Sequence, residues 1–234
     1  MVERFAGFAV AVLFGTTLAN AQAPLQRVNV KTGQSVDFVT GGTVRVSGTA
    51  GDLNIETWDQ PRVEATLTTT EYANAGNRDA VKQRLASVDL VVEKRGNDVA
   101  VEMKPPKRHF WGRWLHGATN ATVECRVMIP REAKLVVHHG DGSVLVYGAA
   151  GDIDATTRFG DIVVQLPEPA RYAMDAKVRM GNVYTDYEGQ YRSRVLVGEK
   201  YMSQGEAGAH HIRLRVGIGG IDIVKMAADA AHGL

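Results

Sequence analysis

Short alternations of apolar and polar residues, each introduced by a glycine, recur along the chain. In each copy, a glycine and a usually polar residue precede two apolar residues that are separated by one variable position. Apolar residues two positions apart lie on the same face of a β-strand, and glycine permits the positive φ of a sharp bend. The copies are Gly42–Val46, Gly51–Ile55, Gly142–Val146, Gly151–Ala155, Gly160–Val164, Gly181–Thr185 and Gly219–Ile223. The pattern predicts short strands joined by tight corners around a shared apolar interior.

The predicted interior is formed by one apolar stripe. Its members are Val144, Val146, Ile153, Ala155, Ile162, Val164, Leu166, Val183, Ile221 and Ile223. An Asp or Asn beside the glycine can bond the local backbone, so these residues are expected to hold the corners.

The spacing of the glycines favours a stack of coils. Gly142, Gly151 and Gly160 follow one another at intervals of nine residues, so two units make one coil of about 18 residues. Stacked coils let each strand pair with the strand one coil away. An antiparallel β-sandwich with the same strand and turn spacing is the alternative. The stack is favoured because two-residue hairpin signals are absent and the coil-length spacing recurs at Gly181 and Gly219.

Residues 62–129 follow a different pattern. Alternation predicts strands over residues 62–70, 88–93, 98–103 and 121–129, with a turn at 95–97. Asn77 is expected to cap a short helix in which Val81, Leu85 and Val88 share one face. We expect this hairpin-type segment to continue the same sheets. Residues 24–234 contain no linker-like run, which indicates a single domain.

The N-terminus has the organisation of a secretory signal peptide. An apolar run over Phe5–Leu18 follows Arg4, and the small residues of Ala19–Ala23 fit a cleavage site. We expect residues 1–23 to be removed and the protein to be exported, to the periplasm or the cell surface.

Composition narrows the function classes. The 27 Lys and Arg residues balance 26 Asp and Glu residues, giving a formal charge of +1. A balanced exported chain is not expected to bind nucleic acid. The single cysteine, Cys125, excludes an intrachain disulfide. Since it alternates with Val123 and Val127, we expect it to be a small buried hydrophobe and not a reactive thiol.

At these residues the chain resembles a bacterial family of "putative adhesins" of unknown function, with an exported β-solenoid-like domain that carries Gly-Asp-Ile repeats. The resemblance is carried by Gly51–Asp59, Val127–Pro130, Ala133–Val137 and Gly140–Val164. It implies an all-β, right-handed β-solenoid or β-helix-like repeat stack at the cell envelope. The family brings no established catalytic residues, so the resemblance assigns no catalytic residue, cofactor or metal to this chain.

A loop over residues 104–116 combines basic and aromatic side chains, as surfaces that bind membranes, glycans or anionic polymers do. The alternative is that the aromatic residues fold back as a plug over the β-core. The candidate binding residues are Lys107, Arg108, Phe110, Trp111, Arg113 and Trp114. The partners expected for such a loop are a cell-envelope glycan, a membrane surface or a protein.

The histidines and aspartates indicate a metal or catalytic site only weakly. Neighbours in the pairs His138-His139 and His210-His211 point to opposite faces of a strand, so neither pair readily holds one metal ion. The carboxylates of the repeats are better explained as corner caps than as calcium ligands, because the calcium β-roll spacing is absent. Stacked carboxylates could also reach the separation that glycoside hydrolysis needs, although nothing in the spacing selects a pair. These carboxylates are Asp141, Asp152, Asp154 and Asp161.

The sequence therefore favours an exported, non-enzymatic cell-envelope protein with a structural or adhesin-like binding role. The alternative is a carbohydrate-active enzyme or glycan-binding module that uses a groove on the β-solenoid. Self-association through exposed ends of the stack is a further hypothesis.

Overall fold

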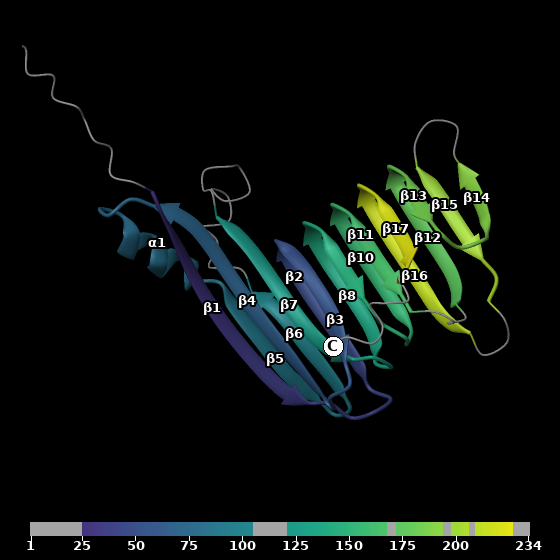
Figure 1. The fold of residues 1–234 in the computed structure, drawn as a ribbon, viewed down its shortest axis with the longest axis horizontal. Coiled ribbons are helices and arrows are strands. Elements are labelled where there is room, and N and C mark those ends of the chain that lie inside the picture. Colours follow the sequence, from purple (N-terminus) through teal and green to yellow (C-terminus); the bar gives the residue numbers. More distant parts are fainter. Residues whose placement is uncertain (1–24, 105–120, 168–171, 194–197, 206–208, 227–234) are drawn as a thin grey trace, which may run out of the picture.

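Two β-sheets and one short helix make up the described part of the chain (Figure 1). The computed structural model describes residues 25–104, 121–167, 172–193, 198–205 and 209–226. Both sheets mix parallel and antiparallel pairs, and neither closes on itself. The helix α1 (Arg78–Leu85) lies at the N-terminal end of the sheets and begins after Asn77, as predicted, but the Asn77 side chain makes no capping hydrogen bond and Val88 falls beyond the helix.

The strands divide between the sheets as follows. The eight-stranded sheet has the order β1 (Gln26–Asp37), β4 (Arg62–Ala73), β7 (Thr122–Pro130), β3 (Asp52–Trp58), β9 (Val144–Tyr147), β11 (Ile162–Leu166), β17 (Ile221–Lys225) and β13 (Val183–Thr185). The nine-stranded sheet has the order β14 (Gln190–Ser193), β15 (Glu199–Ser203), β12 (Tyr172–Met180), β16 (His210–Ile218), β10 (Ile153–Phe159), β8 (Lys134–Asp141), β2 (Thr43–Ala50), β6 (Asp98–Lys104) and β5 (Asp89–Arg95).

The central strands of both sheets pair in parallel, and antiparallel pairs occur towards the sheet ends. The parallel ladders run from β7 to β13 in one sheet and from β6 to β12 in the other. The antiparallel pairs are β1 with β4, β4 with β7, β5 with β6, β12 with β15 and β14 with β15. Two facing sheets fit the sandwich alternative, while the parallel ladders are what successive coils would produce.

The chain passes repeatedly from the nine-stranded to the eight-stranded sheet. The strand pairs β2–β3, β8–β9, β10–β11, β16–β17 and β12–β13 lie next to one another in that order. The 18-residue step is confirmed, because Val144 lies opposite Ile162. The last pair in sequence, β16–β17, is however inserted before β12–β13, so that Val183 lies opposite Ile221.

Five of the seven repeated glycines, those at 51, 142, 160, 181 and 219, have positive φ and lie where the chain passes from the nine-stranded to the eight-stranded sheet, whereas Gly42 and Gly151 precede β2 and β10 without positive φ. Gly142, Gly160, Gly219 and Gly181 all have positive φ, from 112° to 141°. A Cβ on Gly160 would lie 2.3 Å from the carbonyl oxygen of Gly142, and one on Gly219 would lie 2.1 Å from that of Gly160. Glycine is therefore required at these corners both by backbone conformation and by the close approach of the neighbouring corner.

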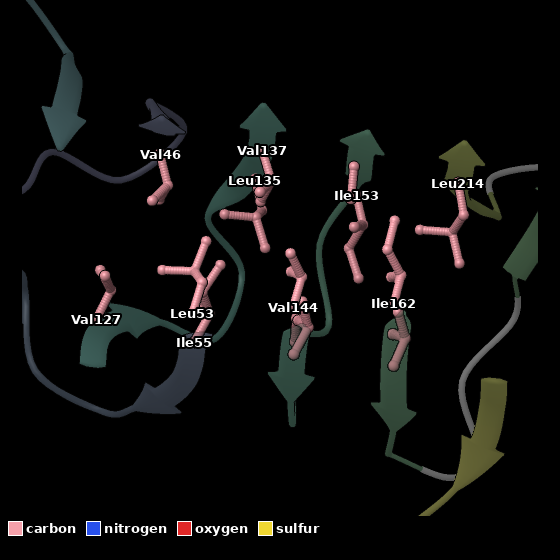
Figure 2. Packing of buried hydrophobic residues seen from close by; sticks show 14 of the residues in the cluster. Val46, Leu53, Ile55, Val127, Leu135, Val137, Val144, Ile153, Ile162 and Leu214 are labelled. Atoms are coloured by element: carbon pink, nitrogen blue, oxygen red, sulfur yellow. The ribbon is translucent and has the colours of Figure 1, made fainter. Parts of the chain in front are cut away.

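One apolar core fills the space between the sheets (Figure 2). Side chains from β2, β8, β10 and β16 meet side chains from β3, β7, β9 and β11. All ten residues of the predicted stripe are buried. Alternate residues of each strand thus face the core, which leaves the polar alternates on the outer faces.

The N-terminal end of the two sheets is joined by a side chain. Gln34 of β1 donates from Nε2 to the Leu90 carbonyl oxygen at 2.8 Å and accepts from the Val92 N–H at 2.9 Å. It thereby uses backbone groups of the edge strand β5. A second, smaller cluster of Val28, Ala73, Val81 and Leu85 packs α1 against β1 and β4.

We expect Gly160→Ala to destabilise the protein because the corner cannot accept a side chain. A non-glycine residue at this φ of 112° costs about 1–3 kcal/mol of unfolding free energy, before the contact with Gly142 is counted. Urea denaturation measures the change. The control is Gly33→Ala, whose added Cβ would lie 3.7 Å from its nearest neighbour and should change stability by less than about 0.5 kcal/mol. Equal effects of the two substitutions would contradict the role assigned to the corner.

Candidate functional site

An open groove of about 1340 Å³ lies on the nine-stranded sheet, towards its β12, β14 and β15 end. Among the described residues, its lining contains seven basic side chains and a single acidic one, Glu199. The basic residues are Arg158, Lys177, Arg179, Arg192, Lys200, Arg213 and Arg215. In a chain of nearly balanced charge, this is a strong local excess of positive charge. We call this surface the cationic groove.

The parallel register brings these residues together from distant parts of the sequence. Residues directly opposite one another form a row that crosses six strands. The row runs His138, Thr156, Arg215, Lys177, Lys200 and Arg192. Neighbouring strands lie about 4.8 Å apart, so the row presents closely spaced donors. Arg158 and Arg179 lie two residues further along their strands, towards the glycine corner.

Two of the groove cations are paired within the sheet. Asp175 accepts from the Arg215 guanidinium at 2.6 Å and lies 3.5 Å from the Lys200 ammonium. Partial burial opposes ionisation of Asp175. The hydrogen bond from Arg215 and the charges of Arg215 and Lys200 outweigh that effect and lower the pKa of Asp175 below its ordinary value. Asp175 therefore stays charged and orients Arg215.

The other basic side chains of the groove are open to a ligand. Among the described residues, no carboxylate lies within 4.0 Å of the cationic groups of Arg158, Lys177, Arg179, Arg192 and Arg213. Apart from Arg192 they come from strands whose alternate residues are buried, so they project from the outer face. The arrangement can bind an anion with several negative charges.

Of the four predicted corner caps, Asp152 and Asp161 bond backbone groups, across strand pairs and not locally, whereas Asp154 lies within β10 and not at a corner. The Asp52 carboxylate accepts from the Ser143 N–H at 3.2 Å, Asp152 from the His211 N–H at 2.9 Å, and Asp161 from the Gly220 N–H at 2.6 Å. Each bond joins one corner to the next strand pair. Glu199, the one carboxylate of the groove lining, likewise accepts from the Val183 N–H at 2.8 Å.

The histidine pairs divide between the two faces of the sheet, as their positions on strands predict. His138 and His139 both line the groove, but His139 is buried, with Nε2 at 2.7 Å from the Gly51 carbonyl oxygen. His210 packs against the Tyr172 ring and lies 3.6 Å from Asp152. Within the described ranges, no group of three or more His, Cys, Asp or Glu side chains could hold a metal ion.

The aromatic and basic loop proposed from the sequence lies outside the described residues. Lys107, Arg108, Phe110, Trp111, Arg113 and Trp114 all belong to residues 105–120. The cationic groove was missed by the sequence analysis. Its signal was the alternation of basic residues in Lys177-Val-Arg179 and Arg213-Leu-Arg215, which places both cations of each pair on one face of a strand.

Comparison with known proteins gives distant structural likenesses only. The sequence matches no family model and no curated protein. Among solved structures, a "putative cell adhesion protein" from Clostridium sporogenes is 11% identical with a TM-score of 0.48, and the match covers 84% of this chain and 100% of that chain. A "putative adhesin" from Bacteroides fragilis is 9% identical with a TM-score of 0.22, covering 84% of this chain and 97% of that chain. A "putative adhesin" from Parabacteroides merdae is 7% identical with a TM-score of 0.28, covering 84% and 96% respectively.

These names agree with the family that the sequence resembles, while the likenesses themselves are too distant to carry an argument. In the part of the chain that the structure describes, no helix combines the length and apolar character needed to cross a membrane.

Cys125 is buried in the core, as the alternation around it predicts. Burial, with a smaller contribution from the Glu124 charge, raises the pKa of the Cys125 thiol to about 12. The thiolate is the reactive form, so a buried thiol that stays protonated is inert. We therefore expect no reaction of the native protein with a thiol reagent at pH 8, and one equivalent in guanidinium chloride.

A Thr32→Cys variant controls for reagent access, since position 32 is exposed on β1 and should react rapidly in the folded protein. Rapid modification of Cys125 in the native wild type would show that the β7 side of the core opens.

Proposed function

We propose that this chain is an exported, non-enzymatic protein of the cell envelope that binds an anionic partner through the cationic groove. The observation that supports this most directly is the seven-to-one excess of basic over acidic side chains in the groove lining. A partner with several negative charges would meet donors that are already held in one row by the sheet. Because the backbone is already ordered, the conformational freedom lost on binding is mainly that of the side chains.

The lining favours binding over hydrolysis. Glycoside hydrolysis needs two carboxyl groups that flank the scissile bond. Of the described residues that line the groove, Glu199 is the one carboxylate, and it is engaged with the backbone of Val183. The alternative of a carbohydrate-active enzyme therefore has no observation in its favour here, whereas binding of an acidic glycan would be compatible with the proposal.

We also propose that the central strand pairs form a solenoid-like stack. The repeated passage between sheets and the in-register parallel ladders support this, and a corner shared by successive pairs is what such a coil needs. The stack would serve as a rigid support that holds the groove cations in register.

Export is proposed from the N-terminal pattern of residues 1–23. If it is correct, the mature protein begins at Gln22 or Pro24, after a small residue at the cleavage site. N-terminal sequencing of protein recovered from the envelope fraction of a bacterial host measures this. An intact Met1 in that fraction would argue for an uncleaved anchor.

The aromatic and basic loop is a second proposed binding element of the same protein. Its cations and tryptophans would act on the same class of partner, or its aromatic residues would act as a plug over the core. Loss of binding with unchanged stability on Trp111→Ala and Trp114→Ala would favour the binding role. A loss of about 3–5 kcal/mol of stability would favour the plug.

The groove is tested by neutralising two of its unpaired cations. We expect the double substitution Arg158→Gln and Arg179→Gln to weaken binding to polygalacturonate, a soluble acidic polymer, by roughly 30-fold. The reason is that each cation near an anionic surface contributes about 1 kcal/mol. Affinity electrophoresis at low and high salt measures the change, and screening should weaken the wild-type interaction.

The matched control replaces two exposed cations on other strands, Lys31→Gln and Lys94→Gln. This variant loses the same charge and should bind as the wild type does. Equal weakening by both double variants would mean that net charge alone drives binding and would refute the groove as the site.

A further inference from the structure

Three large apolar side chains are exposed side by side at the corner of the nine-stranded sheet. Phe159, Ile218 and Met180 are the last residues of β10, β16 and β12, and they lie directly opposite one another. Their exposed fractions are 44%, 45% and 47%. Each is followed by a corner glycine, so the row stands where the chain turns into the other sheet. We call these three residues the corner ridge.

The corner ridge meets the cationic groove at the strand ends, where the two lie on opposite faces of the sheet: the ridge residues share the inward face of Thr157, Val178 and Val216, and the arginines project from the outer face. Arg158 and Arg179 immediately precede Phe159 and Met180 and line the groove. Between them, on β16, the equivalent position is Gly217, which adds no side chain. Two arginines about two strand spacings apart, roughly 10 Å, therefore flank an open position beside three apolar side chains.

This combination fits a lipid surface better than a soluble polymer. A soluble acidic polymer offers charges but no apolar phase, so it would leave the ridge exposed to water. An anionic bilayer offers both, because apolar side chains enter the boundary between headgroups and acyl chains while cations stay with the headgroups. Because neighbours along a strand point to opposite faces, a bilayer contacts the ridge and the arginines together where it faces the ends of the strands.

Three described carboxylates lie near the ridge, and one of them, Glu199 of the groove lining, accepts from the Val183 N–H three residues beyond Met180. Asp141 lies opposite Phe159 on β8, and Asp161 follows Gly160. Asp161 accepts a hydrogen bond from the Gly220 N–H, which places it on the eight-stranded side of the corner. The seven groove cations lie on the other side. The excess of positive charge on the groove side of the corner therefore favours an anionic surface as the partner.

We propose that the corner ridge and the adjoining part of the cationic groove dock onto an anionic phospholipid bilayer, with Phe159, Ile218 and Met180 inserted at the interface. This inference rests on the proposed function and adds the chemical class of the partner. The strand ends of β10, β12 and β16 would point at the membrane, and no spanning segment is needed.

The test measures co-sedimentation of the full exported chain with two kinds of vesicle. One is phosphatidylglycerol mixed with phosphatidylcholine, and the other is phosphatidylcholine alone. We expect binding to the anionic vesicles only, weakened by salt. The triple substitution Phe159→Ser, Ile218→Ser and Met180→Ser should lower partitioning at least about tenfold. The same variant should still bind polygalacturonate as the wild type does.

The matched control removes three exposed apolar side chains elsewhere: Val39→Ser, Tyr72→Ser and Tyr184→Ser. Unchanged urea midpoints of both triple variants establish that they are folded. Vesicle binding that survives the ridge substitutions, or that falls equally in the control, overturns the membrane inference. Wild-type binding to polygalacturonate but not to vesicles also overturns it and keeps the proposed function. If the wild-type protein binds neither polygalacturonate nor vesicles, both the proposed function and the membrane inference are rejected.

Discussion

The close stacking of backbone at the glycine corners is the constraint on which the rest of the structure depends. At Gly181 an added Cβ would lie 1.7 Å from the Gly219 carbonyl oxygen, closer than atoms can approach. The Gly160 N–H donates to the Ile218 carbonyl oxygen at 2.9 Å, and the Gly219 N–H donates to that of Met180 at 3.0 Å. The corners are thus joined directly by their backbones, and this fixes the register of the strands on either side.

Fixed register decides where the polar side chains lie. Because the parallel strands of one sheet end at the stacked corners and those of the other sheet start from them, residues at the same distance from the glycine are neighbours across each sheet. Apolar residues then meet inside, and Lys177 and Arg215 meet outside. Asp175, which pairs with both Arg215 and Lys200, partly offsets the repulsion between these like charges. The arrangement suggests that the clustered charge is held for a partner, because stability alone would favour its dispersal.

The sequence predicts the repeating element well, since the apolar positions and the glycines obey local rules. It could not predict that β16–β17 lies between β10–β11 and β12–β13. The units at Gly181 and Gly219 have the same pattern, and either could follow Gly160. The choice depends on β15, which pairs antiparallel with one edge of β12 and leaves its other edge for β16. No sequence pattern within β15 (Glu199–Ser203) indicates that pairing.

The proposed binding surface was harder to predict for a related reason. A loop that concentrates Lys107, Arg108, Trp111 and Trp114 is visible in a short window of sequence, whereas the groove gathers cations from β10, β12, β14, β15 and β16. A net charge of +1 conceals such a surface, because acidic residues elsewhere cancel it in the sum. At the groove itself the distant acidic residues cancel the positive charge much less, because salt screens their charges beyond about 8 Å. The charge of such a surface should therefore be counted over the outward-facing residues of each strand, because a partner contacts those residues.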